Sequence, residues 1–280
     1  MDIKILSPLW GYECLEYKTF LEKVKKAGYD GYDLWLPDCK KDRHLLYNFL
    51  QKHEMTLVTH QHAANGRTFN EFKASYVREL LACAEPGPLL INSHTGRDYF
   101  PLEQHIVLVD IAEEISAKTG VVIVHETHRG RLGYSPQMMQ TIFNLRKQVK
   151  ITADFSHWTC VTESMLQYFE NTVKEAIRRT RHVHARIGYE QGPQVPDPRA
   201  AKYQYALNHF LYWWDQIVET NKEIGTKLLS FTTEFGPFPY MPADPVTSEP
   251  LADQFELNCF MKNLLDSRYK RTNGSQFGML

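Results

Sequence analysis

Short apolar runs alternate with amphipathic stretches along the whole chain, and this alternation constrains the fold more than any other feature. Each run is rich in β-branched or other apolar residues and is only four to six residues long, which predicts a buried strand. The intervening stretches carry apolar residues three and four positions apart, which predicts helices. The predicted strands are Ile3–Leu6, Tyr32–Leu36, Met55–Thr59, Leu89–Asn92, Val121–His125, Lys150–Ala153, His182–Ile187 and Leu228–Thr233.

Eight strand–helix repeats with short connections predict a parallel sheet closed into a (β/α)8 TIM barrel, an α/β fold. We expect a single domain over residues 1–268, followed by a polar tail at 269–280 that could contact a second copy of the chain in a homo-oligomer. A doubly wound open sheet is the alternative. No Gly-x-Gly-x-x-Gly or Walker-type loop follows a predicted strand, which weakens that alternative.

Composition narrows the class of protein. The 280 residues carry a formal net charge of -1, so no general basic field encourages binding to nucleic acid. The five cysteines are scattered without a Cys-x-x-Cys pair, which argues against a disulfide framework and a thiolate zinc site. The N-terminus lacks a secretory leader pattern and no apolar run reaches transmembrane length. We therefore expect a cytoplasmic protein without a membrane partner.

Four successive predicted strands end at a metal-ligating side chain. These residues are Glu126, Asp154, His184 and Glu234. Taken singly, each would usually be a helix cap, an ion-pair partner or a core histidine. In a parallel barrel, however, the carboxyl ends of the strands meet over the mouth, so the four would converge. Three carboxylates and one imidazole suit one divalent ion, Mn²⁺, Mg²⁺ or Zn²⁺.

The motifs around these residues resemble the xylose isomerase-like TIM-barrel superfamily. The motifs are His125-Glu126-Thr127-His128, Asp154-x-x-His157, His182-Val183-His184-Ala185-Arg186 and Thr233-Glu234-Phe235-Gly236. This superfamily includes sugar isomerases, ketose 3-epimerases, inosose dehydratases and metal-dependent apurinic endonucleases. The resemblance implies Glu126, Asp154, His184 and Glu234 as shared metal ligands and His157 as the residue that holds a substrate hydroxyl.

The resemblance further implies a metal-dependent isomerase or epimerase acting on a ketose, sugar acid or sugar phosphate. A cation that polarises the carbonyl stabilises the enediolate left when the neighbouring proton departs. We expect Glu126 and Glu234 to take and return that proton, and Asp154 to be a ligand only. An inosose-type dehydratase would use the same metal and the same proton abstraction, so it stays an alternative.

Other side chains on the predicted active face are candidates for substrate contact. Arg186 lies two residues past His184 and could reach the substrate or orient Glu126. We also expect His94, His128 and Trp10 at the pocket. Six arginines fall in loops or strand ends, and guanidinium groups favour carboxylate or phosphate. We expect Arg129 and Arg186 to face the substrate and the others to hold loops through acidic neighbours; the six are Arg67, Arg97, Arg129, Arg131, Arg186 and Arg199.

Two further functions remain open. An apurinic endonuclease of this superfamily needs three metals, with extra ligands from His60 or His62, His94, His157 and an Asp-x-His sequence in the loop after the seventh strand. This chain has Asp197-Pro198-Arg199 there, so the third metal lacks a ligand. A barrel without activity that serves as a binding module is the other possibility, and the presence of all four ligands argues against it.

Overall fold

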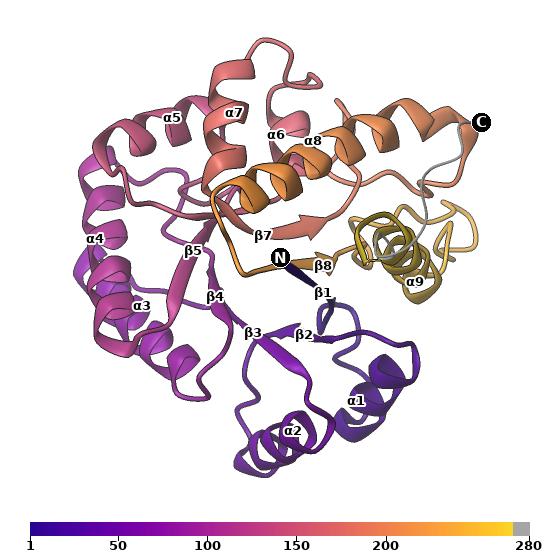
Figure 1. Ribbon diagram of the computed structural model, residues 1–280, viewed down its shortest axis with the longest axis horizontal. Helices are drawn as coiled ribbons and strands as arrows, with labels where there is room; N and C mark the ends of the chain where they lie inside the picture. The colour runs from indigo at the N-terminus through magenta and orange to yellow at the C-terminus, as the bar shows by residue number, and fades with distance from the viewer. Residues whose placement is uncertain (271–280) are drawn as a thin grey trace.

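Parallel pairing links every strand to the next and the last strand to the first. The computed structural model describes residues 1–270 of the chain. Its eight strands form a closed barrel in the order of the sequence, with helices packed around the outside (Figure 1). The barrel closes where β1 pairs with β8, in a register that sets Asp2 opposite Leu228 and Leu6 opposite Thr232. The predicted (β/α)8 barrel is therefore confirmed.

The elements follow the predicted alternation. The strands are β1 (Asp2–Pro8), β2 (Gly31–Leu34), β3 (Thr56–Gln61), β4 (Leu90–Ser93), β5 (Val122–Glu126), β6 (Ile151–Ala153), β7 (Thr180–Ala185) and β8 (Leu228–Thr233). The α-helices are α1 (Tyr17–Lys26), α2 (Lys40–His53), α3 (Phe69–Ala84), α4 (Leu102–Thr119), α5 (Pro136–Leu145), α6 (Phe155–Val161), α7 (Glu170–Arg179), α8 (Gln204–Glu223) and α9 (Gln254–Leu265). A 3-10 turn precedes α8 and a π-helical turn, Asp266–Lys270, follows α9.

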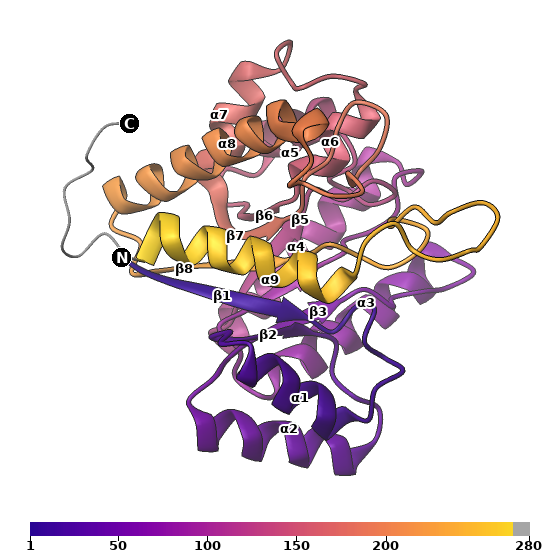
Figure 2. The ribbon, with the colours of Figure 1, turned by 90° about the vertical axis from the view of Figure 1, so that its right-hand side faces the viewer.

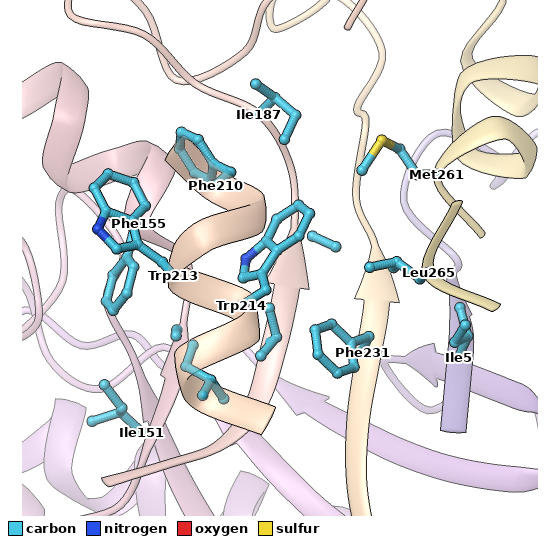
Figure 3. Packing of buried hydrophobic residues seen from close by; sticks show 14 of the residues in the cluster. Ile5, Ile151, Phe155, Ile187, Phe210, Trp213, Trp214, Phe231, Met261 and Leu265 are labelled. Carbon is cyan, nitrogen blue, oxygen red and sulfur yellow. The ribbon is translucent and has the colours of Figure 1, made fainter. Parts of the chain in front are cut away.

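The core lies between the strands and the surrounding helices, as expected when each helix buries one apolar face. Figure 3 shows the part of this core beneath α8, where Trp214 faces Phe231 of β8. Phe210 and Trp213 of the same helix are also buried, and Trp213 packs edge-on against Phe155. These aromatic side chains fix α8 against the barrel wall because each removes a large apolar area from water.

Local sequence signals set the ends of several helices. Ser135 accepts a hydrogen bond from Met138 N at the start of α5, and Pro136 occupies the first helical position. Thr68 and Glu71 form a reciprocal capping box at the start of α3. These caps satisfy backbone donors that would otherwise be unpaired at the helix ends.

The structure departs from the predicted elements in two places. α6 begins directly after Asp154, where no helix was predicted. The apolar residues Met165, Phe169 and Val173 recur at four-residue spacing and predict a helix over this stretch. The helix observed there, α7, begins only at Glu170, because Glu163 and Leu166 adopt left-handed backbone angles that keep the preceding segment out of a helix.

The chain end expected to be a tail is partly ordered. Tyr269 donates a hydrogen bond to Asp215, and Lys270 forms ion pairs with Asp30 and Asp266. The rest of the predicted tail, 271–280, lies outside the described residues. Within residues 1–270, no helix has both the length and the apolar character needed to cross a membrane.

Long loops extend beyond one end of the barrel. Figure 2 shows the connection between β8 and α9 projecting on the side toward which the β1 arrow points, the carboxyl end of the strands. The loop after β7 contacts it, since Gly236 N donates to the Gln194 side chain at 2.7 Å and Gln194 donates back to Gly236 O. The two proline-rich loops therefore form a joined wall over the barrel mouth.

Candidate active site

The four side chains predicted as metal ligands lie together at this mouth. Glu126 is the last residue of β5, Asp154 directly follows β6, His184 lies in β7, and Glu234 directly follows β8. One potential ligand atom from each lies within 4.8 Å of those of the other three. All four residues are buried. Consecutive parallel strands thus bring into one cluster residues that span more than a third of the sequence.

The donor atoms of this cluster fit a divalent cation. His184 Nδ1 lies 3.0 Å from Glu234 Oε2 and 3.6 Å from Glu126 Oε1. Within residues 1–270, both His184 Nδ1 and Glu234 Oε2 are buried without a hydrogen-bond partner of good geometry. Buried polar atoms normally have partners, and a cation bound beside these two atoms would satisfy both of them. Oxygen atoms with one imidazole nitrogen suit Mg²⁺, Mn²⁺ or Zn²⁺.

The other ring nitrogen of His184 is held by Asp33 of β2. Asp33 Oδ2 accepts hydrogen bonds from His184 Nε2 at 3.0 Å, His182 Nε2 at 3.1 Å and Thr232 Oγ1 at 3.0 Å. Burial acts to raise the pKa of Asp33, but the two histidines outweigh it and hold that pKa well below its usual range. Asp33 was not predicted as a site residue; the available signal was a carboxylate inside an otherwise apolar strand.

Glu126 is fixed by two donors. Asn92 Nδ2 donates to Glu126 Oε2 at 2.7 Å, and His94 Nε2 donates to the same oxygen at 2.9 Å. Burial acts to raise the pKa of Glu126, yet His94 and His184 lower it well below its usual range. Asn92 was also missed from the sequence, because an amide at the end of an apolar run carries no distinctive pattern.

A second group of potential ligands shares Glu126. His60 of β3, His94 and Glu126 offer three ligand atoms within 4.8 Å of one another. His60 Nε2 lies 3.8 Å from Glu126 Oε2, and His60 Nδ1 lies 3.8 Å from Asp33 Oδ1. The mouth thus contains two adjacent candidate cation positions joined by one carboxylate.

Arg186 lies on the wall of the mouth and is engaged by β6 and β8. Its guanidinium binds Asp154 and lies 3.3 Å from Glu234 Oε2. It also donates to Ser156 Oγ at 3.1 Å and to His157 Nε2 at 2.9 Å. Among the described residues, no hydrogen bond or ion pair joins Arg186 to Glu126. The alternative in which Arg186 orients Glu126 is therefore wrong, because its side chain turns toward β6 and β8.

The pKa values of Asp154 and Glu234, the two carboxylates beside Arg186, are shifted in opposite directions. Burial raises the pKa of Asp154 to about 7, and Arg186 only partly offsets this effect. For Glu234, burial also acts to raise the pKa, but His184 and Arg186 reverse the shift and lower it. His184 lies between carboxylates, and although burial disfavours its charge, Glu234 and Glu126 raise its pKa well above 6.5. The carboxylates around His184 therefore favour its protonated form in the metal-free cluster.

A cavity of about 430 Å³ opens over the cluster. This volume is within the range of small-molecule sites. The predicted residues Trp10, His94, His128, Arg186 and Glu234 contribute to its wall. The remaining wall residues are Pro8, Glu13, Asp33, Trp35, His60, His62, Arg131 and Tyr240. Aromatic faces with a few converging polar groups suit the mixed surface of a sugar.

Two other predicted contact residues lie behind this wall. His157 is fully buried, with its ring 4.0 Å from that of His128. The Arg129 guanidinium carbon lies 5.0 Å from the Tyr240 ring centre, and Arg186 approaches the same ring at 4.9 Å. Neither His157 nor Arg129 lines the cavity; His157 contacts His128 and Arg129 contacts Tyr240, two residues that do.

The loop arginines expected to be structural divide into two groups. Arg199 pairs with Asp197 at 2.7 Å, and Arg97 donates to Ala64 O at 3.0 Å. Arg67 is exposed outside the cavity. Arg131, in contrast, contributes to the cavity wall.

Comparison with known proteins agrees with the barrel fold. The sequence model of the xylose isomerase-like TIM barrel family matches residues 21–192. A search of the curated proteins finds no match.

Several solved structures share the fold at low sequence identity. A D-tagatose 3-epimerase-like protein superposes with a TM-score of 0.64 and 15% identity, over 96% of this chain and 98% of its own. A xylose isomerase-like TIM barrel protein from Mycobacterium smegmatis, in complex with magnesium, gives 0.59 and 11%, over 94% and 97%. Endonuclease IV from Thermus thermophilus gives 0.58 and 12%, over 96% and 100%. With more than half of its length matched, the chain belongs to the xylose isomerase-like TIM barrel family.

Proposed function

We propose that this protein is a metal-dependent isomerase or epimerase that moves a proton beside the carbonyl of a small sugar-derived substrate. One observation carries the proposal: Glu126, Asp154, His184 and Glu234 converge within 4.8 Å beside a cavity of about 430 Å³ with aromatic walls. The epimerase-like and magnesium-bound structures of the same fold support it as analogies.

The four converging residues would hold one divalent cation, which when bound supplies Lewis acidity at the substrate carbonyl oxygen. Glu234 lines the cavity and its Oε2 has no hydrogen-bond partner of good geometry within residues 1–270, so we assign it the removal of the proton from carbon. Glu126 is held by Asn92 and His94 and is assigned the return of a proton on the other side. Proton transfer by positioned carboxylates contributes about 10²- to 10⁴-fold to a rate.

Hydrogen exchange tests this function directly. Protein loaded in turn with Mn²⁺, Mg²⁺ and Zn²⁺ is incubated in deuterated water with ketoses, sugar acids and inososes, and proton NMR follows the signal beside the carbonyl. We expect exchange with at least one substrate and loss of exchange after chelation. New vinylic signals would assign a dehydratase instead. Absence of exchange with every substrate and metal would refute proton abstraction at this site.

A second candidate function rests on the ligand group that shares Glu126. Cations held by His60, His94 and Glu126 and by the four-residue cluster would be bridged by one carboxylate, as in two-metal phosphodiester hydrolysis. Endonuclease IV has the same fold. Elemental analysis and hydrolysis of bis(p-nitrophenyl) phosphate separate the two functions. About two metals per chain with diester cleavage would favour the hydrolase, and about one metal without cleavage would favour the isomerase.

A further inference from the structure

Arg131 lies on the cavity wall and has no counter-charge among residues 1–270. Its Nε atom is buried and has no hydrogen-bond partner within the described part of the chain. Across residues 1–270, no hydrogen bond or ion pair involves its guanidinium group, although the side chain is partly buried. Arginine offers five donors, and a buried donor without a partner costs free energy. Such an arginine in a cavity indicates a ligand that supplies the missing acceptors.

The carboxylates on the same wall are engaged elsewhere. Asp33 accepts three hydrogen bonds beneath His184. Glu234 faces His184 and Arg186. Glu13 accepts from Gly11 N at 2.8 Å in its own loop. None of these three groups lies within ion-pair distance of Arg131, so this wall offers Arg131 no counter-charge among residues 1–270.

The loop that carries Arg131 is held firmly by its neighbours. Leu132 N donates to Thr95 O at 2.8 Å, and Trp158 Nε1 donates to Gly133 O at 2.8 Å. A side chain at Gly133 would place its Cβ 2.4 Å from Glu126 O, so this backbone packs directly against the end of β5. The backbone that carries Arg131 is therefore fixed before a ligand arrives, which lowers the entropic cost of ordering this loop on binding.

Arg131 differs in this respect from the other arginines of the active face. Arg186 is satisfied by Asp154 and Glu234, and Arg199 by Asp197. Arg129 stacks on Tyr240 behind the wall. Only Arg131, among these arginines, combines a place on the cavity wall with unused donors.

We propose that the substrate carries a carboxylate or phosphate group and that Arg131 binds this group. The inference rests on the proposed function only in placing the substrate in this cavity. A guanidinium fork matches both oxyanions, and charge-assisted hydrogen bonds are about twice as strong as neutral ones. The reacting end of the substrate then lies at the Glu126–Glu234 cluster and the anionic end at Arg131, so a neutral sugar would use only part of the site.

Binding measurements with matched ligands test this assignment. Metal-loaded protein is titrated calorimetrically with D-fructose, D-fructuronate, D-fructose 6-phosphate and inorganic phosphate. We expect fructuronate or fructose 6-phosphate to bind about 10- to 100-fold tighter than fructose, a gain typical of hydrogen bonds to charged groups. The better of the two identifies the oxyanion as carboxylate or phosphate. Equal affinity for the neutral and anionic sugars, or no binding by either anion, would overturn the inference.

Variants then assign the preference to Arg131. Arg131→Gln should abolish the anion preference, and Arg131→Lys should retain only part of it because ammonium lacks the planar fork. Arg67→Gln is the matched control, since Arg67 lies on the same face but outside the cavity wall. Retained preference in folded Arg131→Gln, verified by circular dichroism, would contradict the inference.

The outcomes separate this inference from the proposed function. If the protein prefers anionic sugars and this preference depends on Arg131, but no sugar exchanges deuterium, the anion-binding site is supported and the isomerase function is refuted. If neutral and anionic sugars exchange deuterium equally and Arg131→Gln does not change the exchange, the isomerase function is supported and the anion-binding site is refuted.

Discussion

His184 presents opposite ring nitrogens to two different groups: its Nε2 donates to Asp33 at 3.0 Å, while its Nδ1 faces the carboxylates of the candidate metal site. A carboxylate on one nitrogen fixes both the tautomer and the orientation of a metal-ligating imidazole. Asp33 lies in β2 and His184 in β7, so Asp33 acts on the site through His184 from a strand that is distant in the sequence.

Asp33→Asn should weaken metal binding by about 10- to 100-fold, the usual effect of removing such a supporting group. Asparagine keeps the size of the side chain but removes the negative charge of the group that accepts from His184, His182 and Thr232. Titration against a metal-sensitive dye measures the effect. Asp110→Asn, which removes a carboxylate paired with Arg146 at the surface, is the charge-matched control. Wild-type affinity in folded Asp33→Asn would show that His184 does not need this support.

Metal affinity should rise with pH. Because Glu234 and Glu126 raise the pKa of His184 in the metal-free protein, they favour a protonated ring, which must lose a proton to bind a metal. Below that raised pKa, each added pH unit should strengthen apparent affinity by about tenfold, with release of about one proton. Calorimetric titration with metal in buffers of different ionisation enthalpy measures the number of protons released on binding. Affinity independent of pH from 6 to 8 would mean that His184 is neutral or is not a ligand.

Arg186 should stabilise the metal-free protein more than the metal-loaded one. Arg186→Met leaves buried Asp154 and Glu234 without their cation, and loss of one partner of a buried ion pair costs about 3–5 kcal/mol. A bound divalent ion would supply the missing positive charge. In urea unfolding, metal should therefore increase the free energy of unfolding more for Arg186→Met than for the wild type.

The control for this comparison is Arg179→Met. Arg179 is also buried, but it donates to Lys147 O and Val149 O away from the barrel mouth. Arg179→Met should therefore lower the free energy of unfolding by the same amount with and without metal. If metal rescues both variants equally, or neither, the neutralising role of Arg186 is disproved.

Glu126→Gln and Glu234→Gln should each reduce deuterium exchange by about 10²- to 10⁴-fold at saturating metal, because glutamine cannot accept the proton. Metal content must be measured in parallel, since both residues are also predicted ligands. Glu13→Gln, on the same cavity wall but bonded within its own loop, should retain most of the activity. Full exchange in both site variants would mean that another group takes the proton.

Strand position was predictable because short apolar runs and helical periodicity report burial directly. Each observed strand begins and ends within two residues of its predicted bounds. α6 was not predictable in the same way. It has only seven residues and is buried on most sides, so it has no amphipathic period, and Asp154 caps it by accepting from Ser156 N.

The candidate site was predictable where a residue stood at a strand end. Glu126, Asp154, His184 and Glu234 followed from position and resemblance, and the structure brings them together. The side chains that hydrogen-bond to these four residues could not be predicted from the sequence in the same way. Asp33 lies inside its strand, and its role depends on β2 lying across the barrel from His184, a relation that only the closed structure defines.

The pairing of β1 with β8 has a consequence for synthesis of the protein. Leu6 meets Thr232, so the first strand lacks one neighbour until residues 228–233 have left the ribosome. An unpaired strand edge invites association with other chains, and contacts of such long sequence separation form slowly. A nascent chain interrupted before residue 228 would expose the edges of both β1 and β7. Premature termination in this gene should therefore produce aggregation, and chaperone engagement should persist until the last strand is complete.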